Sequence, residues 1–87
     1  MSYLTENGAK TALELHLKNK RSDLPWDKVV WDEVHVTPHK GLHPSKVTIN
    51  GNLFFEGDST ETWYFDVEIE RTDSGENIFH DLVFIIL

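Results

Sequence analysis

The residues with the clearest chemical potential are three histidines that lie within nine positions of one another: His35, His39 and His43. Neutral imidazoles are ligands for zinc, nickel and copper, and a nearby carboxylate can complete a zinc site of the catalytic type. The four-residue spacings would align the rings on a helix, but Pro38 and Gly41 disfavour a helix here. On a strand and loop, the rings meet only if the loop folds back. We therefore expect no bound metal or cofactor, with these histidines as the candidates if one is present.

The second chemical feature is an uneven distribution of acidic residues. Residues 47–87 hold nine Asp or Glu residues against one Arg, a balance of −8, whereas residues 1–46 hold six acidic residues against seven Lys or Arg, a balance of +1. A field of that sign repels phosphate backbones and attracts basic partners. The composition argues against direct binding of nucleic acid. It favours either a basic protein partner or an acidic surface that serves solubility.

Paired carboxylates in catalysis need a cleft that raises the pKa of one of them, and a chain of 87 residues is too short to wall a deep pocket. We therefore predict no catalytic residues.

The element that positions most of the acidic residues is the segment 62–71. Its apolar side chains alternate without a break with polar ones, and successive side chains of a strand face opposite sides of a sheet. The segment is therefore predicted to be a strand with one buried and one solvated face. The buried face comprises Trp63, Phe65, Val67 and Ile69. The solvated face carries the residues that we expect to bind a partner, namely Tyr64, Asp66, Glu68 and Glu70, with Glu56, Asp58 and Glu61 near its rim.

Residues 4–19 fit two kinds of element. The alternation from Leu13 to Lys18 suits a strand, but no β-branched residue lies between Ala12 and Arg21. Glu14 is also spaced for i,i+4 ion pairs with a lysine on each side. We predict a helix, with Leu13, Leu15 and Leu17 on its broad apolar side.

Three further strands are predicted, at residues 29–37, 46–56 and 78–87. Gly51 in the middle of the second predicts a bulge or a sharp bend, because a residue without a side chain weakens a regular ladder. The last strand is apolar on both faces over Leu82–Leu87, which is typical of a central strand or of one covered on both sides. At a sheet edge, the same residues would favour a two-fold homodimer.

Together these elements predict a single α+β domain over residues 1–87, with one N-terminal helix packed on a four-stranded antiparallel meander. This order of elements is similar to the cystatin-like and nuclear-transport-factor-like architectures. The resemblance is one of topology alone. The Gln-Val-Val-Ala-Gly hairpin of cystatins does not occur, since residues 47–51 are Val-Thr-Ile-Asn-Gly, so no role as a protease inhibitor is implied.

Two functions remain open. The first is a small acidic protein-binding module that docks on a basic partner, for example as an inhibitor or a nucleic-acid mimic. The alternative is a compact ligand-binding or enzymatic domain that uses the histidines of residues 35–43. The chain has no cysteine, no apolar segment typical of a signal peptide and no apolar run long enough to span a membrane. We therefore expect a cytoplasmic protein that does not interact with membranes.

Overall fold

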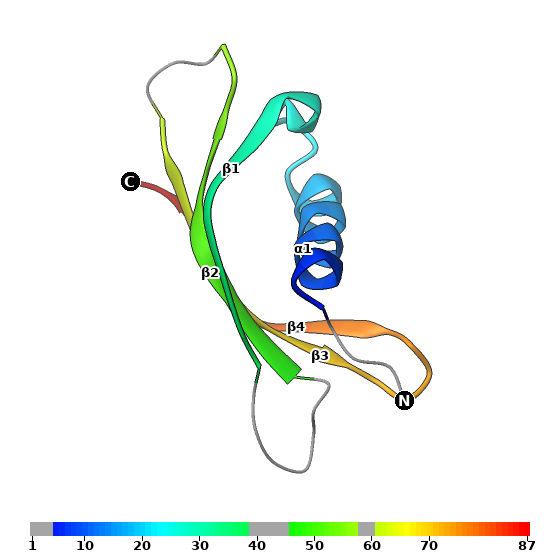
Figure 1. Ribbon diagram of the computed structural model, residues 1–87. Coiled ribbons are helices and arrows are strands. Elements are labelled where there is room, and N and C mark those ends of the chain that lie inside the picture. Colours follow the sequence, from blue (N-terminus) through cyan, green and yellow to red (C-terminus); the bar gives the residue numbers. More distant parts are fainter. Residues whose placement is uncertain (1–4, 39–45, 58–60) are drawn as a thin grey trace.

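The computed structural model describes residues 5–38, 46–57 and 61–87. Over these ranges the chain forms one α-helix, a short 3-10 helix and four strands: α1 (Glu6–Lys20), η1 (Trp26–Lys28), β1 (Val29–Pro38), β2 (Lys46–Phe55), β3 (Trp63–Arg71) and β4 (Asn77–Ile86). The strands pair antiparallel in the order β1-β2-β3-β4. The sheet curves around α1, which lies on its concave face (Figure 1). The predicted α+β fold, one helix on a four-stranded antiparallel meander, is confirmed.

Thr5 caps the N-terminus of α1, because its Oγ1 accepts a hydrogen bond from the Gly8 N–H at 3.0 Å. Its buried side consists of residues four apart, Ala9, Leu13 and Leu17. The prediction that Leu15 shares this side is wrong, because Leu15 is 61% exposed. A helix turns by about 100° per residue, so a residue two positions from its buried neighbours points to the opposite side.

The core lies between α1 and the concave face of the sheet. Phe65 is fully buried, and the ring of Trp31 meets it edge-on with the ring centroids 5.3 Å apart. The alternation predicted for β3 is confirmed, and β2 contributes four more buried apolar residues on the same face. The two sets are Trp63, Phe65, Val67 and Ile69 of β3, and Val47, Ile49, Leu53 and Phe55 of β2.

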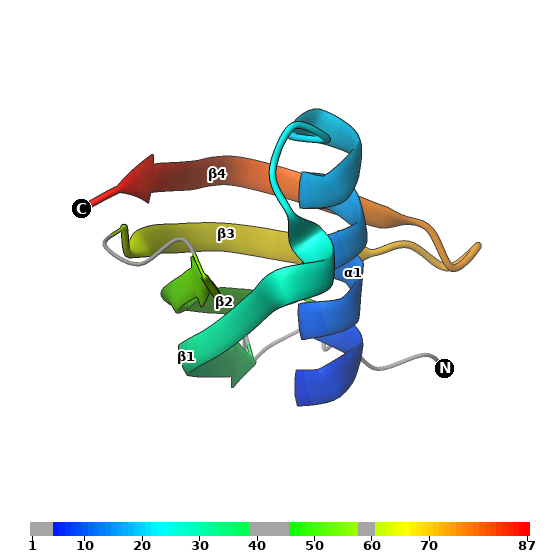
Figure 2. The ribbon, with the colours of Figure 1, turned by 90° about the horizontal axis from the view of Figure 1, so that it is seen from above.

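α1 crosses the strands at an angle (Figure 2) and contacts both edges of the sheet. At one edge, the Trp31 Nε1–H of β1 donates a hydrogen bond to Glu14 Oε1 at 3.3 Å. At the other edge, the His16 ring stacks on Phe79 of β4 with the centroids 3.9 Å apart. Trp31 is thus a partly buried residue at the sheet edge that packs against the core and connects β1 to the helix.

The irregularity predicted at Gly51 is present as a bulge in the facing strand. The register of β1 against β2 shifts between Trp31 and Glu33, so Asp32 is an extra residue. The β1 backbone approaches Gly51 so closely that a Cβ atom there would lie 1.7 Å from the Glu33 carbonyl oxygen. Gly51 also has φ +155°, a conformation that L side chains rarely adopt. Both features require glycine.

β4 lies at an edge of the sheet in the described part of the chain. The interpretation of its apolar second half as a central strand is therefore wrong. A second bulge interrupts the strand at Asp81, which has φ 56°. Beyond the bulge, Phe84 packs against the core, whereas Val83 and Ile85 alternate with it and are exposed. One face of the apolar run is therefore in solvent, whereas the other packs against the core at Phe84 and is exposed again at Ile86, which is 47% exposed.

Candidate functional site

The predicted partner-binding residues of β3 lie together on the sheet face that points away from α1, which we call the outer face. Because Phe65, Val67 and Ile69 face the helix, the residues between them face outward. We call Tyr64, Asp66, Glu68 and Glu70 the acidic stripe; all four are partly exposed. Neighbouring members lie roughly 6.7 Å apart along the strand, since each residue adds about 3.3–3.4 Å.

The strand on one side of the acidic stripe does little to compensate its charge. In the register of β2 against β3, the partners of Tyr64, Asp66 and Glu68 are neutral: Asn52, Asn50 and Thr48, respectively. The fourth partner is cationic, because Lys46 lies opposite Glu70. Cross-strand neighbours are close enough for opposite charges to stabilise each other. Among the β2 residues directly opposite the stripe in the described register, Lys46 is the one that carries a charge.

β4 on the other side of the stripe has one basic side chain, His80, and one acidic side chain, Asp81. His80 lies opposite Glu68 in the register, and its Nε2 is 3.2 Å from Glu70 Oε1. Asp66 faces Val83 instead. Within the described ranges, Asp66 makes no ion pair and has neutral neighbours on both adjacent strands. Among the stripe carboxylates, Asp66 therefore has the least compensated charge in its strand register.

Two of the three predicted rim residues are visible near one end of the stripe. Glu56 follows β2 and Glu61 precedes β3, and both are exposed. They belong to the β2–β3 connection, which joins the sheet at the Tyr64 end of the stripe. Asp58 lies outside the described residues. The same end carries Phe54, which is 36% exposed and lies on the outer face because its neighbours in the strand, Leu53 and Phe55, are buried.

The histidine cluster is only partly visible. His35 lies on the outer face of β1 opposite Asn50, with its Nε2 3.8 Å from Glu33 Oε2. His39 and His43 lie outside the described residues. Over the ranges that the structure describes, no three His, Cys, Asp or Glu side chains are placed to hold a metal ion. The described residues therefore add no support to the metal hypothesis.

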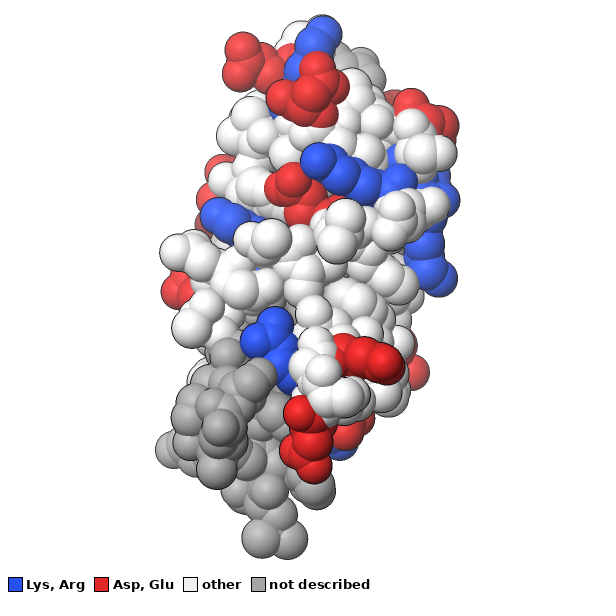
Figure 3. All heavy atoms as spheres, turned by 90° about the vertical axis from the view of Figure 1, so that its right-hand side faces the viewer, with Lys and Arg blue, Asp and Glu red and all other residues white. Residues whose placement is uncertain are grey.

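The opposite side of the molecule has a different charge pattern. Figure 3 shows that Lys and Arg side chains are interspersed with Asp and Glu side chains on the side that carries α1. Lys18 of this helix, for example, pairs with Glu14 at 3.5 Å. Mixed charges largely cancel one another beyond a Debye length of about 8 Å. The outer face is therefore the better candidate for recognition by charge.

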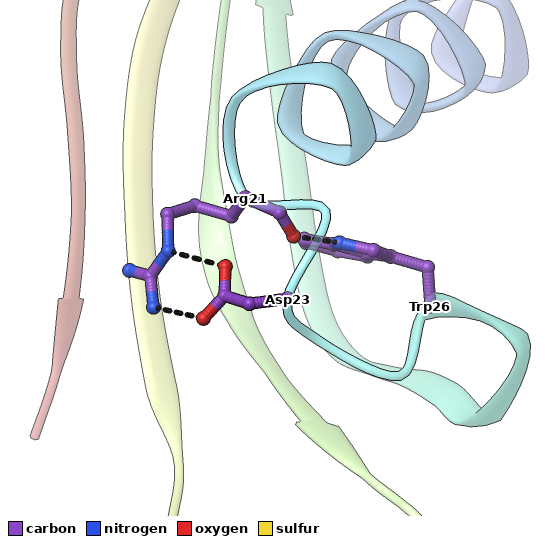
Figure 4. Close-up of polar contacts among 3 residues, drawn as sticks. All are labelled: Arg21, Asp23 and Trp26. Carbon is purple, nitrogen blue, oxygen red and sulfur yellow. Dashed lines mark hydrogen bonds and ion pairs between the residues drawn. The ribbon is translucent and has the colours of Figure 1, made fainter.

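A corner after α1 contains a polar cluster that the sequence did not predict. Arg21 Nε and Nη2 donate to the two carboxylate oxygens of Asp23, each at 3.1 Å, and Trp26 Nε1–H donates to the Arg21 carbonyl at 2.8 Å (Figure 4). The hydrogen bonds from the Arg21 side chain hold the pKa of Asp23 below its usual value. The Arg21 guanidinium also lies 5.4 Å from the centre of the Trp63 ring. The cluster orders the turn into η1, and no sequence signal relates residue 21 to residue 63.

The same corner borders a hollow of about 340 Å³ between α1 and β4. Leu17, Leu82 and Phe84 supply its apolar lining, and Lys20 and Arg21 its charged lining. Arg21 is already engaged by Asp23, so its charge is partly satisfied. The hollow thus lacks the convergent polar groups of a small-molecule site.

A scan of protein-family models gives no match to the chain, and searches of the curated proteins and of the solved structures give no significant match. None of the helices in the described ranges has the length and apolar character needed to cross a membrane.

Proposed function

We propose that this protein is a binding module that docks on a basic protein surface through the acidic stripe. The observation that carries the proposal is the position of Asp66 between Asn50 and Val83, with Glu68 and Glu70 further along the same strand. Like charges on one strand face repel each other, and a cationic partner would relieve that repulsion. Such complementarity mainly raises the association rate and selects against acidic partners.

Tyr64 would be the apolar anchor of this surface. Its neighbours across the sheet are Asn52 and Ile85, so one side of the ring borders an exposed apolar residue of β4. Tyrosine is enriched at binding hot spots because it buries a large area and orders few torsions. We expect Tyr64→Ala to speed dissociation about 30-fold, which corresponds to a hot-spot loss of about 2 kcal/mol.

A more specific version of the proposal is that the protein inhibits its partner by mimicking nucleic acid. A DNA strand carries one charge per about 3.4 Å of helix axis, whereas the stripe carries one per roughly 6.7 Å. Three strand carboxylates therefore reach about half the linear charge density of a DNA strand. A mimic would also have to use the rim acids, of which Glu56 and Glu61 are exposed. Docking on a basic surface requires only the stripe.

The test begins with immobilised protein and a cell lysate at low salt. Each retained protein is identified and purified, and its rate constants are measured at low and high salt. Two charge-matched variants are compared with the wild type. The stripe variant carries Asp66→Asn, Glu68→Gln and Glu70→Gln; the control carries Asp27→Asn, Asp73→Asn and Glu76→Gln at exposed positions outside the stripe.

We expect a basic partner whose association slows about tenfold or more in the stripe variant and at high salt, with the control close to wild type. An acidic partner would contradict the proposal. Equal binding by the stripe variant and the control would contradict it as well.

A further inference from the structure

The two edges of the sheet differ in how they are protected against pairing with another strand. Proteins guard exposed strand edges with charges, bulges and prolines. β1 has all three, because a bulge at Asp32 is followed by Glu33 and the strand ends at Pro38. β4 has its bulge at Asp81, but Leu82–Leu87 contains neither a charged residue nor a proline. Only the second half of β4 therefore lacks such protection among the described edges.

This half of β4 also exposes apolar side chains on both faces of the sheet. Exposure reaches 50% for Ile85 on the outer face and 47% for Ile86 on the opposite face. Val83, at 38%, shares the outer face with Ile85, and Leu87 is 72% exposed. Four exposed aliphatic residues within positions 83–87 are unusual on a surface with no partner. Because they carry no charge, they offer nothing to the basic surface proposed for the acidic stripe.

The backbone of this half is directed so that a new strand can bind. The Leu87 N–H donates to the Thr62 carbonyl of the chain preceding β3 at 2.9 Å. In an antiparallel ladder, hydrogen-bonded positions alternate. The backbone N–H and C=O groups of Val83 and Ile85 therefore also point toward β3. The N–H and C=O groups of Phe84 and Ile86 therefore point away from the sheet.

We propose that β4 pairs with β4 of a second copy, antiparallel, about a two-fold axis at Phe84. The Phe84 backbones of the two copies would exchange both hydrogen bonds, and Val83 would lie opposite Ile85 of the second copy on the outer face. The two four-stranded sheets become one sheet of eight strands. The bulge at Asp81 ends the new ladder, so pairing is confined to the uncharged residues.

Between two copies, pairing of β4 with β4 is more favourable than pairing of β4 with β1, the other edge of the sheet. Pairing of β4 with β1 of a neighbour would bring it to an edge that carries a bulge, the charges of Asp32 and Glu33, and Pro38. It would also leave free edges that propagate an open chain. Self-pairing closes with two-fold symmetry. It separates the two acidic stripes by three strand spacings, about 14 Å, which exceeds the Debye length of about 8 Å at physiological salt.

Salt distinguishes this inference from the proposed function. Each copy carries a formal net charge of −7, so repulsion between copies opposes the dimer and weakens as salt is added. The apolar contacts persist at high salt. The dimer should therefore strengthen with salt, whereas docking on a basic partner should weaken. A measurement can therefore contradict the dimer without contradicting the docking proposal, and the reverse.

The experiment is analytical ultracentrifugation of the full chain over a range of concentrations at low and high salt. Ile85→Lys puts a charge on the edge, and Ile86→Pro removes an N–H that points away from β3. Leu15→Lys is the matched control, because it makes the same charge change at a leucine of α1 that is 61% exposed. Circular dichroism of each variant checks that the fold is retained.

We expect a monomer–dimer equilibrium for the wild type and for Leu15→Lys. We expect a dimer constant at least about tenfold weaker for Ile85→Lys and Ile86→Pro, because two-fold symmetry places each change in the interface twice. The amides of Phe84 and Ile86 should gain protection from hydrogen exchange as concentration rises. A wild type that stays monomeric at the highest concentration would overturn the inference, and so would a dimer that both folded edge variants retain.

Discussion

Substitution of Gly51 by alanine tests the closest backbone approach in the sheet. A Cβ atom at this position would lie 1.7 Å from the Glu33 carbonyl oxygen and 2.7 Å from the Glu33 carbonyl carbon. Cβ atoms essentially never approach other heavy atoms within 3.0 Å, so β1 would have to move by at least about 1.3 Å. The obstacle is backbone on a paired strand, so no side-chain rotation can relieve it.

The cost follows from two separate effects. The backbone of Gly51 has φ +155°, and holding an L residue in such a region costs about 1–3 kcal/mol. Moving β1 away would weaken about two ladder hydrogen bonds, at about 0.5–1.5 kcal/mol each. Together these effects predict a loss of about 2–6 kcal/mol. A domain of 87 residues has a free energy of unfolding of about 4–13 kcal/mol, so the variant would lose a large part of its stability.

The assay is urea unfolding followed by tryptophan fluorescence and circular dichroism. Gly75→Ala is the matched control, because Gly75 also has a positive φ, +89°, but nothing lies within 4 Å of its Cβ position. The control isolates the backbone penalty, about 1–2 kcal/mol, from the steric one. If Gly51→Ala costs no more than Gly75→Ala, the close approach of β1 to Gly51 is incorrect.

Two further predictions concern the core and its pH dependence. Phe65→Ala should cost about 3–5 kcal/mol, because the side chain is fully buried against Trp31; a urea midpoint near that of wild type would contradict this. Burial against Phe79, and then the charge of Lys20, lower the pKa of His16 below 6.5. The unfolded state therefore binds more protons below pH 6.5, and the free energy of unfolding should fall as pH decreases through that region. His16→Phe, which keeps the stacking, should reduce this dependence in a pH series of urea titrations, and an unchanged dependence would refute the assignment.

The elements and their faces could be predicted because periodicity is a property of each segment. In β3, the strict alternation from Trp63 to Glu70 sufficed to identify the strand, its buried side and the acidic stripe. The helix was predicted from propensity and from the spacing of Glu14 and Lys18, which form an ion pair in the structure. The exposure of Leu15 was not predicted, because a broad apolar arc on a helical wheel does not show which part of it packs on the sheet.

The neighbours of each residue could not be predicted, because they depend on register and strand order. Asp66 stands beside Asn50 and Val83 only because of the pairing of three strands and the bulge at Asp81. Gly51 could be recognised as an irregularity, but the bulge that requires it lies in another strand. The binding and metal hypotheses for residues outside the described ranges stay predictions.

The second half of β4 shows most clearly which properties the sequence determined and which the tertiary structure determined. Its sequence determined that the segment is extended, uncharged and apolar on both faces, because those properties belong to the residues themselves. Such a segment satisfies its hydrogen bonds equally well in the centre of a sheet or beside another molecule. Only the tertiary structure decided between these, by placing β4 at the edge of the described sheet with β3 on one side. Strand order is set by packing among all the elements, and no local pattern contains that information.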